Sequence, residues 1–241
     1  MNLFYFSSPP TFYRLAGWLA PWFFAMAAAL AVAGLYIAFV VAPTDAQQGE
    51  VYRVIFIHVP AAWMSMFLYF IMACYGGLAL TFNTRLAAMM ARAIAPTGAM
   101  FTFVALWTGA LWGKPTWGTW WVWDARLTSE FILLLMYLGY IALTEAIDDP
   151  RRAANAGALL ALVGVVNIPI IYFSVRWWNT LHQGATISMT AAPKMVSTML
   201  TAMLLMTFCF WSYSFAVVFT RARAIVLEQE SDNEWVKGLE R

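Results

Sequence analysis

The sequence predicts an all-α, polytopic membrane protein with six transmembrane helices. Of its 241 residues, 63% are hydrophobic and only 11% are charged, whereas a soluble domain carries roughly 25% charged residues. A membrane-spanning helix needs about 20 mostly apolar residues, and in lipid a helix satisfies its backbone hydrogen bonds within its own segment. Each of six runs without Lys, Arg, Asp or Glu is therefore expected to be one span: residues 15–44, 54–84, 93–113, 131–144, 153–175 and 195–220.

The ends of these spans follow from the residues that flank the runs. The fourth run is short, and Glu130 and Glu145 at the two membrane interfaces complete it. The second span is expected to open at Pro60, because proline is tolerated in the first helical turn. The first span, from near Ala16, lacks the basic region and cleavage site of a removed signal peptide. No ionisable residue lies within a predicted span, so no intramembrane ion or proton path is indicated.

The basic residues predict that both termini are cytoplasmic. With six spans, the two chain ends and alternate loops share one side of the membrane. The positive-inside bias places the other loops, about 42–59, 113–129 and 174–194, on the periplasmic side. Residues 1–223 are expected to form a single six-helix domain, and residues 224–241 a charged cytoplasmic tail. Nine of the fourteen Lys and Arg residues support this orientation: Arg14, Arg85, Arg92, Arg151, Arg152, Arg221, Arg223, Lys237 and Arg241.

Both histidines of the chain, His58 and His182, fall in the predicted outer loops. Plain interfacial histidines are one interpretation, and a shared metal is the other, because imidazole nitrogen suits iron, zinc and copper. Zinc needs three or four ligands, but the outer loops offer no cysteine and few carboxylates beyond Asp45, Glu50 and Asp124. A haem iron takes four ligands from its own ring, so two histidines match the number that a bis-axial haem requires.

Five tryptophans lie in twelve residues at and after the end of the third span: Trp112, Trp117, Trp120, Trp121 and Trp123. Anchoring at the lipid headgroups is the alternative interpretation, since isolated indoles are typical of the aromatic belt. A belt needs one or two indoles per helix end, so this group favours a platform for a flat apolar ring. Each aromatic contact adds about 0.5–1.5 kcal/mol beyond area burial. Gly113, Pro115 and Gly118 are expected to discourage a regular helix in the first half of the loop.

Arginines in the outer loops are candidate partners for the two propionates of a haem, which accept paired hydrogen bonds. Arg53, Arg126 and Arg176 each lie within a few residues of a histidine or a tryptophan. Pairing with Asp45, Asp124 or lipid phosphate is the alternative for each of them. Asp124 is expected to orient Arg126 or to accept the second N–H of an axial imidazole, and capping the fourth span is compatible with either role.

Other chemistries are not indicated. Cys74 and Cys209 lie inside predicted spans, and no CxxCH motif for covalent haem attachment is present. Because no Walker motif, Ser-His-Asp set or paired-carboxylate site is found, the chain is not expected to be an enzyme. Two rival functions stay open. A b-type haem oxidoreductase would hold haem with histidines inside its helices, and a haem transporter would line a path with polar or small residues.

The segment WGKPTWGTWWVWDARLTSE, residues 112–130, resembles the tryptophan-rich WWD signature of haem-handling membrane proteins. With six spans and one histidine in each flanking outer loop, residues 12–223 resemble the CcmC family of cytochrome c maturation, system I. This resemblance implies a multi-pass protein of the bacterial inner membrane that binds haem b non-covalently and delivers it to the haem chaperone CcmE. It implies the ATP-binding-cassette pair CcmA and CcmB, the small membrane protein CcmD and lipid as partners, and no nucleic acid.

The resemblance also assigns residues by position. It makes His58 and His182 the axial ligands, and the stretch from Trp112 to Asp124 the haem platform. The expected mechanism is that a partner moves the loop carrying one axial histidine, and the haem then leaves. The resemblance adds five loop residues near haem or chaperone: Asp45, Gln48, Arg53, Arg126 and Ser174.

Overall fold

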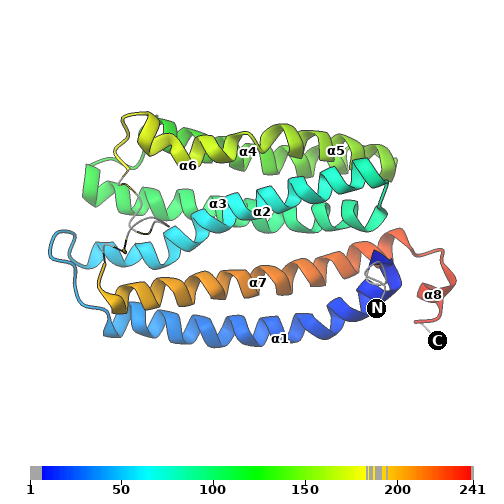
Figure 1. The fold of residues 1–241 in the computed structure, drawn as a ribbon, viewed down its shortest axis with the longest axis horizontal. Helices are drawn as coiled ribbons and strands as arrows, with labels where there is room; N and C mark the ends of the chain where they lie inside the picture. The colour runs from blue at the N-terminus through cyan, green and yellow to red at the C-terminus, as the bar shows by residue number, and fades with distance from the viewer. Residues whose placement is uncertain (1–6, 183, 185–186, 188–191, 194, 240–241) are drawn as a thin grey trace.

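The computed structural model describes residues 7–182, 184, 187, 192–193 and 195–239 as a bundle of long helices (Figure 1). Among these residues, six helical segments are long and apolar enough to cross a membrane, which confirms the predicted all-α membrane fold. The elements are α1 (Pro9–Tyr36) with its π-helical end η2 (Ile37–Val41), the 3-10 helix η3 (Glu50–Val54), α2 (Ile55–Phe82), α3 (Arg85–Trp117), α4 (Ala125–Glu145), α5 (Pro150–Gly164), α6 (Asn167–Trp177), α7 (Ser197–Gln229) and α8 (Glu234–Lys237).

Successive spans run in opposite directions along the bundle. Helix α1 packs along α7 and α2 packs along α3, while α4 and α5 cover the other side of that pair. The connections that follow η2, α3 and α6 gather at one end of the bundle, here called the loop end (Figure 1). The start of α1 and the short helix α8 lie at the opposite end. The described parts of the three predicted outer loops therefore share one end of the molecule.

The fifth span consists of two helices, α5 and α6, which meet at Val165–Val166. Pro169 lies in the first turn of α6, and a proline ring clashes with the carbonyl four residues before it, which interrupts the helix here. Next to this break, the buried Asn167 donates from Nδ2 to the carbonyl of Ser129 in α4 at 2.8 Å. Asn167, which lies at this break, thus links α6 to the start of α4.

Helix α2 begins earlier than predicted. It starts at Ile55 directly after η3, so His58 lies one turn into the helix and Pro60 lies inside it. Tyr52 and Phe56 fix this junction, because both are buried in a hydrophobic cluster with residues of η2 and α7. The predictions that His58 lies in a loop and that Pro60 opens the span were therefore wrong. A helix, not a loop, positions the His58 side chain.

Helix α3 also extends further than predicted. It continues through Gly113 and Pro115 and ends at Trp117, so the expectation of an irregular segment here was wrong. Pro115 lies in the last turn of α3, where it removes one hydrogen bond to the carbonyl four residues earlier, and Thr116 Oγ1 donates to the carbonyl of Trp112 at 2.8 Å. Gly118 does end the helix, with a φ of 78°. Trp117 is thereby held on the last turn of a regular helix.

Glu130 is buried inside the bundle. It belongs to the second turn of α4, is only 6% exposed and contacts Ser65 of α2. The helix predicted to start at Glu130 thus begins five residues earlier, at Ala125. Glu145, at the other end of the same helix, is exposed as expected.

Gly98 of α3 allows Tyr137 of α4 to pack against the α3 backbone. A Cβ at Gly98 would lie 2.1 Å from Tyr137 Cζ, and the buried Tyr137 donates its hydroxyl to the carbonyl of Ser65 at 2.8 Å. Gly98→Ala is therefore expected to lower the free energy of unfolding by about 1–3 kcal/mol, measured as lost thermal stability in detergent. The control is Gly77→Ala, whose Cβ would meet only Leu162 Cδ2, at 3.6 Å. Equal losses in both variants would contradict this account.

Candidate functional site

His58 and His182 lie close together at the loop end of the bundle. Their ring centroids are 6.1 Å apart, and the ring planes are inclined by 33°. When two facing imidazoles each bind one metal atom through a bond of about 2 Å, their centroids lie about 6 Å apart. The two side chains are thus placed at the separation that a single metal atom between them requires.

The His58 ring is held by helix α3. Its Nδ1 lies 3.0 Å from the carbonyl of Ala105 and 3.1 Å from Thr108 Oγ1. Thr108 Oγ1 itself donates to the carbonyl of Val104 at 2.6 Å, so the Nδ1–H donates to the Ala105 carbonyl. This tautomer leaves the lone pair on Nε2, and a carbonyl that holds the second N–H is the usual support of a metal-binding imidazole.

Asp124 caps helix α4 and does not hold the His58 ring. Its Oδ1 accepts a hydrogen bond from the N–H of Leu127 at 2.8 Å, which confirms the predicted N-cap. Among the described residues, its Oδ2 is buried without a hydrogen-bond partner, and no ion pair joins it to Arg126. Asp124 therefore does not orient Arg126 through an ion pair, as was expected.

A small cavity lies between the helices next to the two histidines. It encloses about 40 Å³, which is room for a few water molecules. Its walls are aromatic or apolar apart from the two imidazoles, one arginine and one glutamate, a composition typical of cofactor sites. The lining comes from α2, α3, α4 and the segment after α6: His58, Ala62, Ala105, Leu106, Gly109, Trp112, Trp117, Arg126, Leu127, Glu130 and His182.

Two of the predicted platform tryptophans, Trp112 and Trp117, lie against His182. Each indole centroid is 6.5 Å from the centroid of the His182 ring, and the two indoles meet edge to face at 5.0 Å. Trp112 is buried, with 7% of its surface exposed. These three rings together close one side of the cavity.

The other three tryptophans lie outside the cavity lining. Trp121 packs edge to face against Trp123 at 5.2 Å and against Phe131 at 6.1 Å. Trp123 is 75% exposed beside a second, open hollow, and Trp120 is 54% exposed. In the part of the chain that the structure describes, no ring contact joins this group to the first. The predicted single platform is therefore two aromatic groups, separated by the turn at Gly118.

Gln48 connects the first outer loop to the tryptophans, since its Oε1 accepts from Trp112 Nε1 at 2.9 Å. Asp45 builds the turn that presents it, because Asp45 Oδ1 accepts from the N–H groups of Gln47 at 2.9 Å and Gln48 at 2.8 Å. Gly49 completes the turn with a φ of 59°, which residues with a side chain rarely adopt. Asp45 and Gln48 thus position Trp112 and do not line the cavity themselves.

Gln48→Leu is expected to destabilise the protein by about 1–3 kcal/mol, because it leaves the buried indole N–H of Trp112 without a partner. Thermal stability in detergent measures this effect, and Gln47→Leu, at an exposed position of the same turn, is the control. In a Trp112→Phe background, Gln48→Leu should cost much less, because the two residues act as one unit. Equal costs in both backgrounds would disprove the contact.

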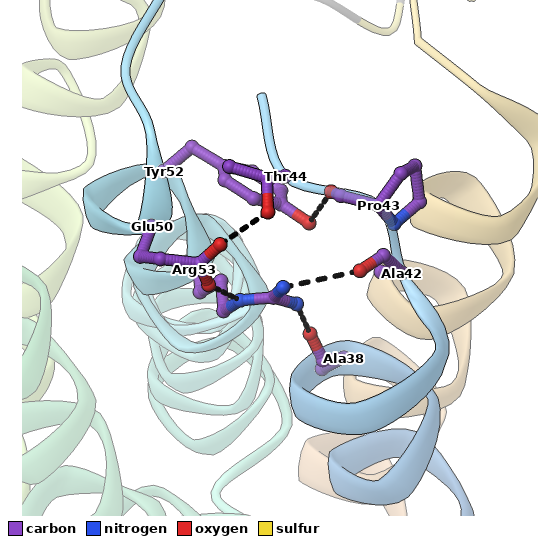
Figure 2. A network of polar contacts seen from close by, with 7 residues as sticks. All are labelled: Ala38, Ala42, Pro43, Thr44, Glu50, Tyr52 and Arg53. Atoms are coloured by element: carbon purple, nitrogen blue, oxygen red, sulfur yellow. Dashed lines mark hydrogen bonds and ion pairs between the residues drawn. The ribbon is translucent and has the colours of Figure 1, made fainter. Parts of the chain in front are cut away.

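Arg53 joins the end of the first span to η3 (Figure 2). Its guanidinium donates to the carbonyl of Ala38 and, at 3.1 Å, to that of Ala42, while Nε pairs with Glu50. The last carbonyls of a helix have no partner within the helix, so Arg53 caps the end of η2. Among the described residues, Arg53 is not part of the cavity lining.

Arg126 is the one predicted arginine that lines the cavity. Its Nη1 donates to the carbonyl of Ile171 at 2.6 Å, and the fully buried Ser174 donates its hydroxyl to the same carbonyl at 2.8 Å. Ser174 therefore lies next to the arginine but behind the cavity wall. Arg176, at the end of α6, is exposed and outside the lining. Of the three arginines, Arg126 is the one positioned to meet a ligand between the histidines.

Glu130 is the charged cavity residue that sequence reasoning missed. It follows Arg126 by four residues, and this spacing puts both side chains on one face of α4. That spacing was the available signal, since Arg126 was already a candidate. Ala105 and Gly109 were missed as well, because a backbone carbonyl and an absent side chain leave no mark in a sequence.

The fold and the site define a multi-pass membrane protein with a paired-histidine, tryptophan-lined cavity at one end of its bundle. A family model described as "Heme exporter protein C" (CcmC) matches residues 2–237. The chain belongs to the CcmC family.

Curated relatives of the same family cover from two thirds to nearly all of the chain. The protein named "Heme exporter protein C" from Escherichia coli K12 is 46% identical over 232 residues, which cover 96% of this chain and 93% of the relative. Its namesake from Haemophilus influenzae is 43% identical over 234 residues, covering 97% and 95%. A Marchantia polymorpha protein named "Putative cytochrome c biosynthesis ccmC-like mitochondrial protein" is 48% identical over 159 residues, covering 66% and 67%.

Proposed function

We propose that this protein binds haem b non-covalently at the periplasmic membrane face and delivers it to the haem chaperone CcmE. The observation that carries the proposal is the pair of His58 and His182, whose ring centroids are 6.1 Å apart. The Nδ1 of His58 is held by the carbonyl of Ala105. Two imidazoles complete the coordination of an iron whose other four ligands come from its ring. The printed names of the relatives, heme exporter proteins, support haem as the ligand.

The location suits haem, which is too apolar for water and too charged for the bilayer core. In the proposed complex His58 and His182 bind the iron, and Trp112 and Trp117 cover part of the ring. Arg126 pairs with a propionate, since guanidinium groups bind carboxylates through paired hydrogen bonds. The cavity brings both histidines, the two indoles and Arg126 to one lining.

The two histidines differ in how they are held, and this difference indicates where the site opens. His58 sits on α2, and its ring is held by the carbonyl of Ala105 in α3. His182 follows the end of α6 at Trp177, and the described residues 178–182 are not helical. A partner that displaces this segment removes one axial ligand and releases the haem. The affinity for haem must be moderate, because each additional 1.4 kcal/mol of binding free energy slows haem release about tenfold at a constant on-rate.

Family membership supports the remaining partners and the location that we propose. The protein works beside the ATP-binding-cassette pair CcmA and CcmB and the small membrane protein CcmD, in the bacterial inner membrane, with both termini cytoplasmic. Haem-loaded protein mixed with haem-free CcmE in detergent is expected to transfer its haem, measured as chaperone-bound haem after separation on different affinity tags. Haem that stays on the donor throughout would contradict delivery.

Two other functions are separated by reconstitution in sealed vesicles. The word "exporter" in the relatives' names favours a transporter that passes haem through its own helices. Such a protein would load haem from inside the vesicle without access to the loop end. A b-type oxidoreductase would hold haem with histidines on its helices, and the position of His58 on α2 favours this alternative. Such an enzyme would turn over with a quinol. Loading only from the side of the loop end, without quinol oxidation, is the result that haem delivery predicts.

A further inference from the structure

Glu130 is a buried carboxyl at the cavity that haem binding, as proposed, does not use. It is 6% exposed, and its Oε1 lies 2.7 Å from Ser65 Oγ. Its Oε2 is buried and has no hydrogen-bond partner among residues 7–182 and the other described positions. Glu130 also contributes to the lining of the cavity between the two histidines. A side chain in this position needs an account of its charge and of its role.

The hydrogen bonds around Ser65 indicate the charge. Ser65 Oγ lies 2.8 Å from the carbonyl of Ala62 and 2.7 Å from Glu130 Oε1, yet a hydroxyl has a single hydrogen to donate. If Glu130 were ionised, two acceptors would share that hydrogen. If Glu130 carries a proton on Oε1, it donates to Ser65 Oγ while Ser65 donates to Ala62. Only the protonated form satisfies both contacts.

The surroundings agree with a neutral carboxyl. A buried carboxylate is costly unless a cation pairs with it, and the ion pairs formed by the described residues do not include Glu130. The cation on the same face of α4 is Arg126, whose charge favours ionisation, but its Nη1 donates to the Ile171 carbonyl. The other titratable groups at the cavity are His58 and His182, and neither supplies a fixed positive charge.

We propose that Glu130 is a positioning residue of the haem site that acts as a neutral acid, hydrogen-bonded to Ser65. The contact joins α4, which carries Arg126, to α2, which carries His58. Tyr137 strengthens the same junction, since its hydroxyl donates to the Ser65 carbonyl at 2.8 Å. Glu130 thereby holds the guanidinium and the imidazole at a fixed separation across the cavity. The part of this proposal that concerns haem rests on the proposed function.

Substitutions at Glu130 test the positioning role. Glu130→Gln keeps a donor for Ser65 Oγ, so it is expected to retain haem within about twofold of wild type, with an unchanged six-coordinate absorption spectrum. Glu130→Leu and Ser65→Ala lose the contact, and one lost buried hydrogen bond is expected to lower bound haem about tenfold and to raise the five-coordinate fraction. Glu145→Leu, at the exposed end of the same helix, is the control. Wild-type haem binding by Glu130→Leu, or its loss in Glu130→Gln, would overturn the proposal.

Infrared spectroscopy of the haem-free protein tests the charge independently. A protonated carboxyl band that is present in wild type and in Glu145→Gln, but absent from Glu130→Gln, is expected. Absence of such a band from wild type would overturn the neutral state, and this measurement needs only the isosteric variant to fold. If His58→Ala kept its six-coordinate haem, the proposed function would fail while the infrared result for Glu130 still stood.

Discussion

Replacing His58 with alanine is expected to abolish the six-coordinate haem spectrum of the purified protein. The variant loses the axial ligand that α2 and the Ala105 carbonyl hold in place, so bound haem should fall by at least about tenfold, equivalent to 1.4 kcal/mol. Haem that remains should be five-coordinate, bound through His182 alone. Absorption and electron paramagnetic resonance spectra of the protein purified in detergent measure both effects.

The reciprocal variant and a rescue experiment complete this test. His182→Ala should give the same loss, because the two rings are arranged about one position. Added imidazole should restore the six-coordinate spectrum of His58→Gly, whose missing ring leaves a space of matching shape. An unchanged six-coordinate spectrum in both alanine variants would remove the axial assignment.

Gly109→Leu, which fills the cavity from helix α3, is expected to reduce haem binding about as much as the loss of His58. A Cβ at Gly109 would already lie 3.1 Å from His58 Cε1, so the longer side chain of Gly109→Leu should displace the imidazole and occupy the space beside it. We expect loss of haem binding with a folded protein, since the substituted position faces a cavity. Haem content per protein and thermal stability in detergent are measured together.

Two variants make this result specific. Gly109→Ala, whose Cβ requires the ring to shift by only a few tenths of an ångström, should bind an intermediate amount of haem. Gly139→Leu, on α4, is the matched control, because its Cβ would meet only Leu160 Cδ2, at 3.9 Å. A Gly109→Leu variant with wild-type haem content would show that the ligand does not enter beside His58.

The fold class could be predicted because lipid imposes a simple rule: uncharged runs of sufficient length become helices. The helix ends could not, because Pro60 and Pro115 are breakers in water but are accommodated within α2 and α3. Glu130 was misplaced for a related reason, since charged residues were used to mark the ends of spans. The partner Ser65, which makes a buried carboxyl tolerable, lies on another helix.

The site could be predicted in part. Two histidines in outer loops with few other metal ligands indicated a haem iron by number alone, and the structure brings them together. Proximity in sequence did not distinguish Arg126, which lines the cavity, from Arg53, which caps η2. The separation of the tryptophans into two groups could not be predicted either, because it depends on α3 continuing to Trp117. Tertiary contacts decide such assignments, and composition and spacing do not contain them.

The most direct test is a cryo-electron microscopy structure of the haem-loaded protein with its partners. We predict one porphyrin at the loop end, with its iron about 2 Å from the Nε2 of His58 and bound on the opposite face by His182. Trp112 and Trp117 should contact the ring, and Arg126 a propionate. A porphyrin bound elsewhere, or an iron that only one of these histidines reaches, would contradict the account.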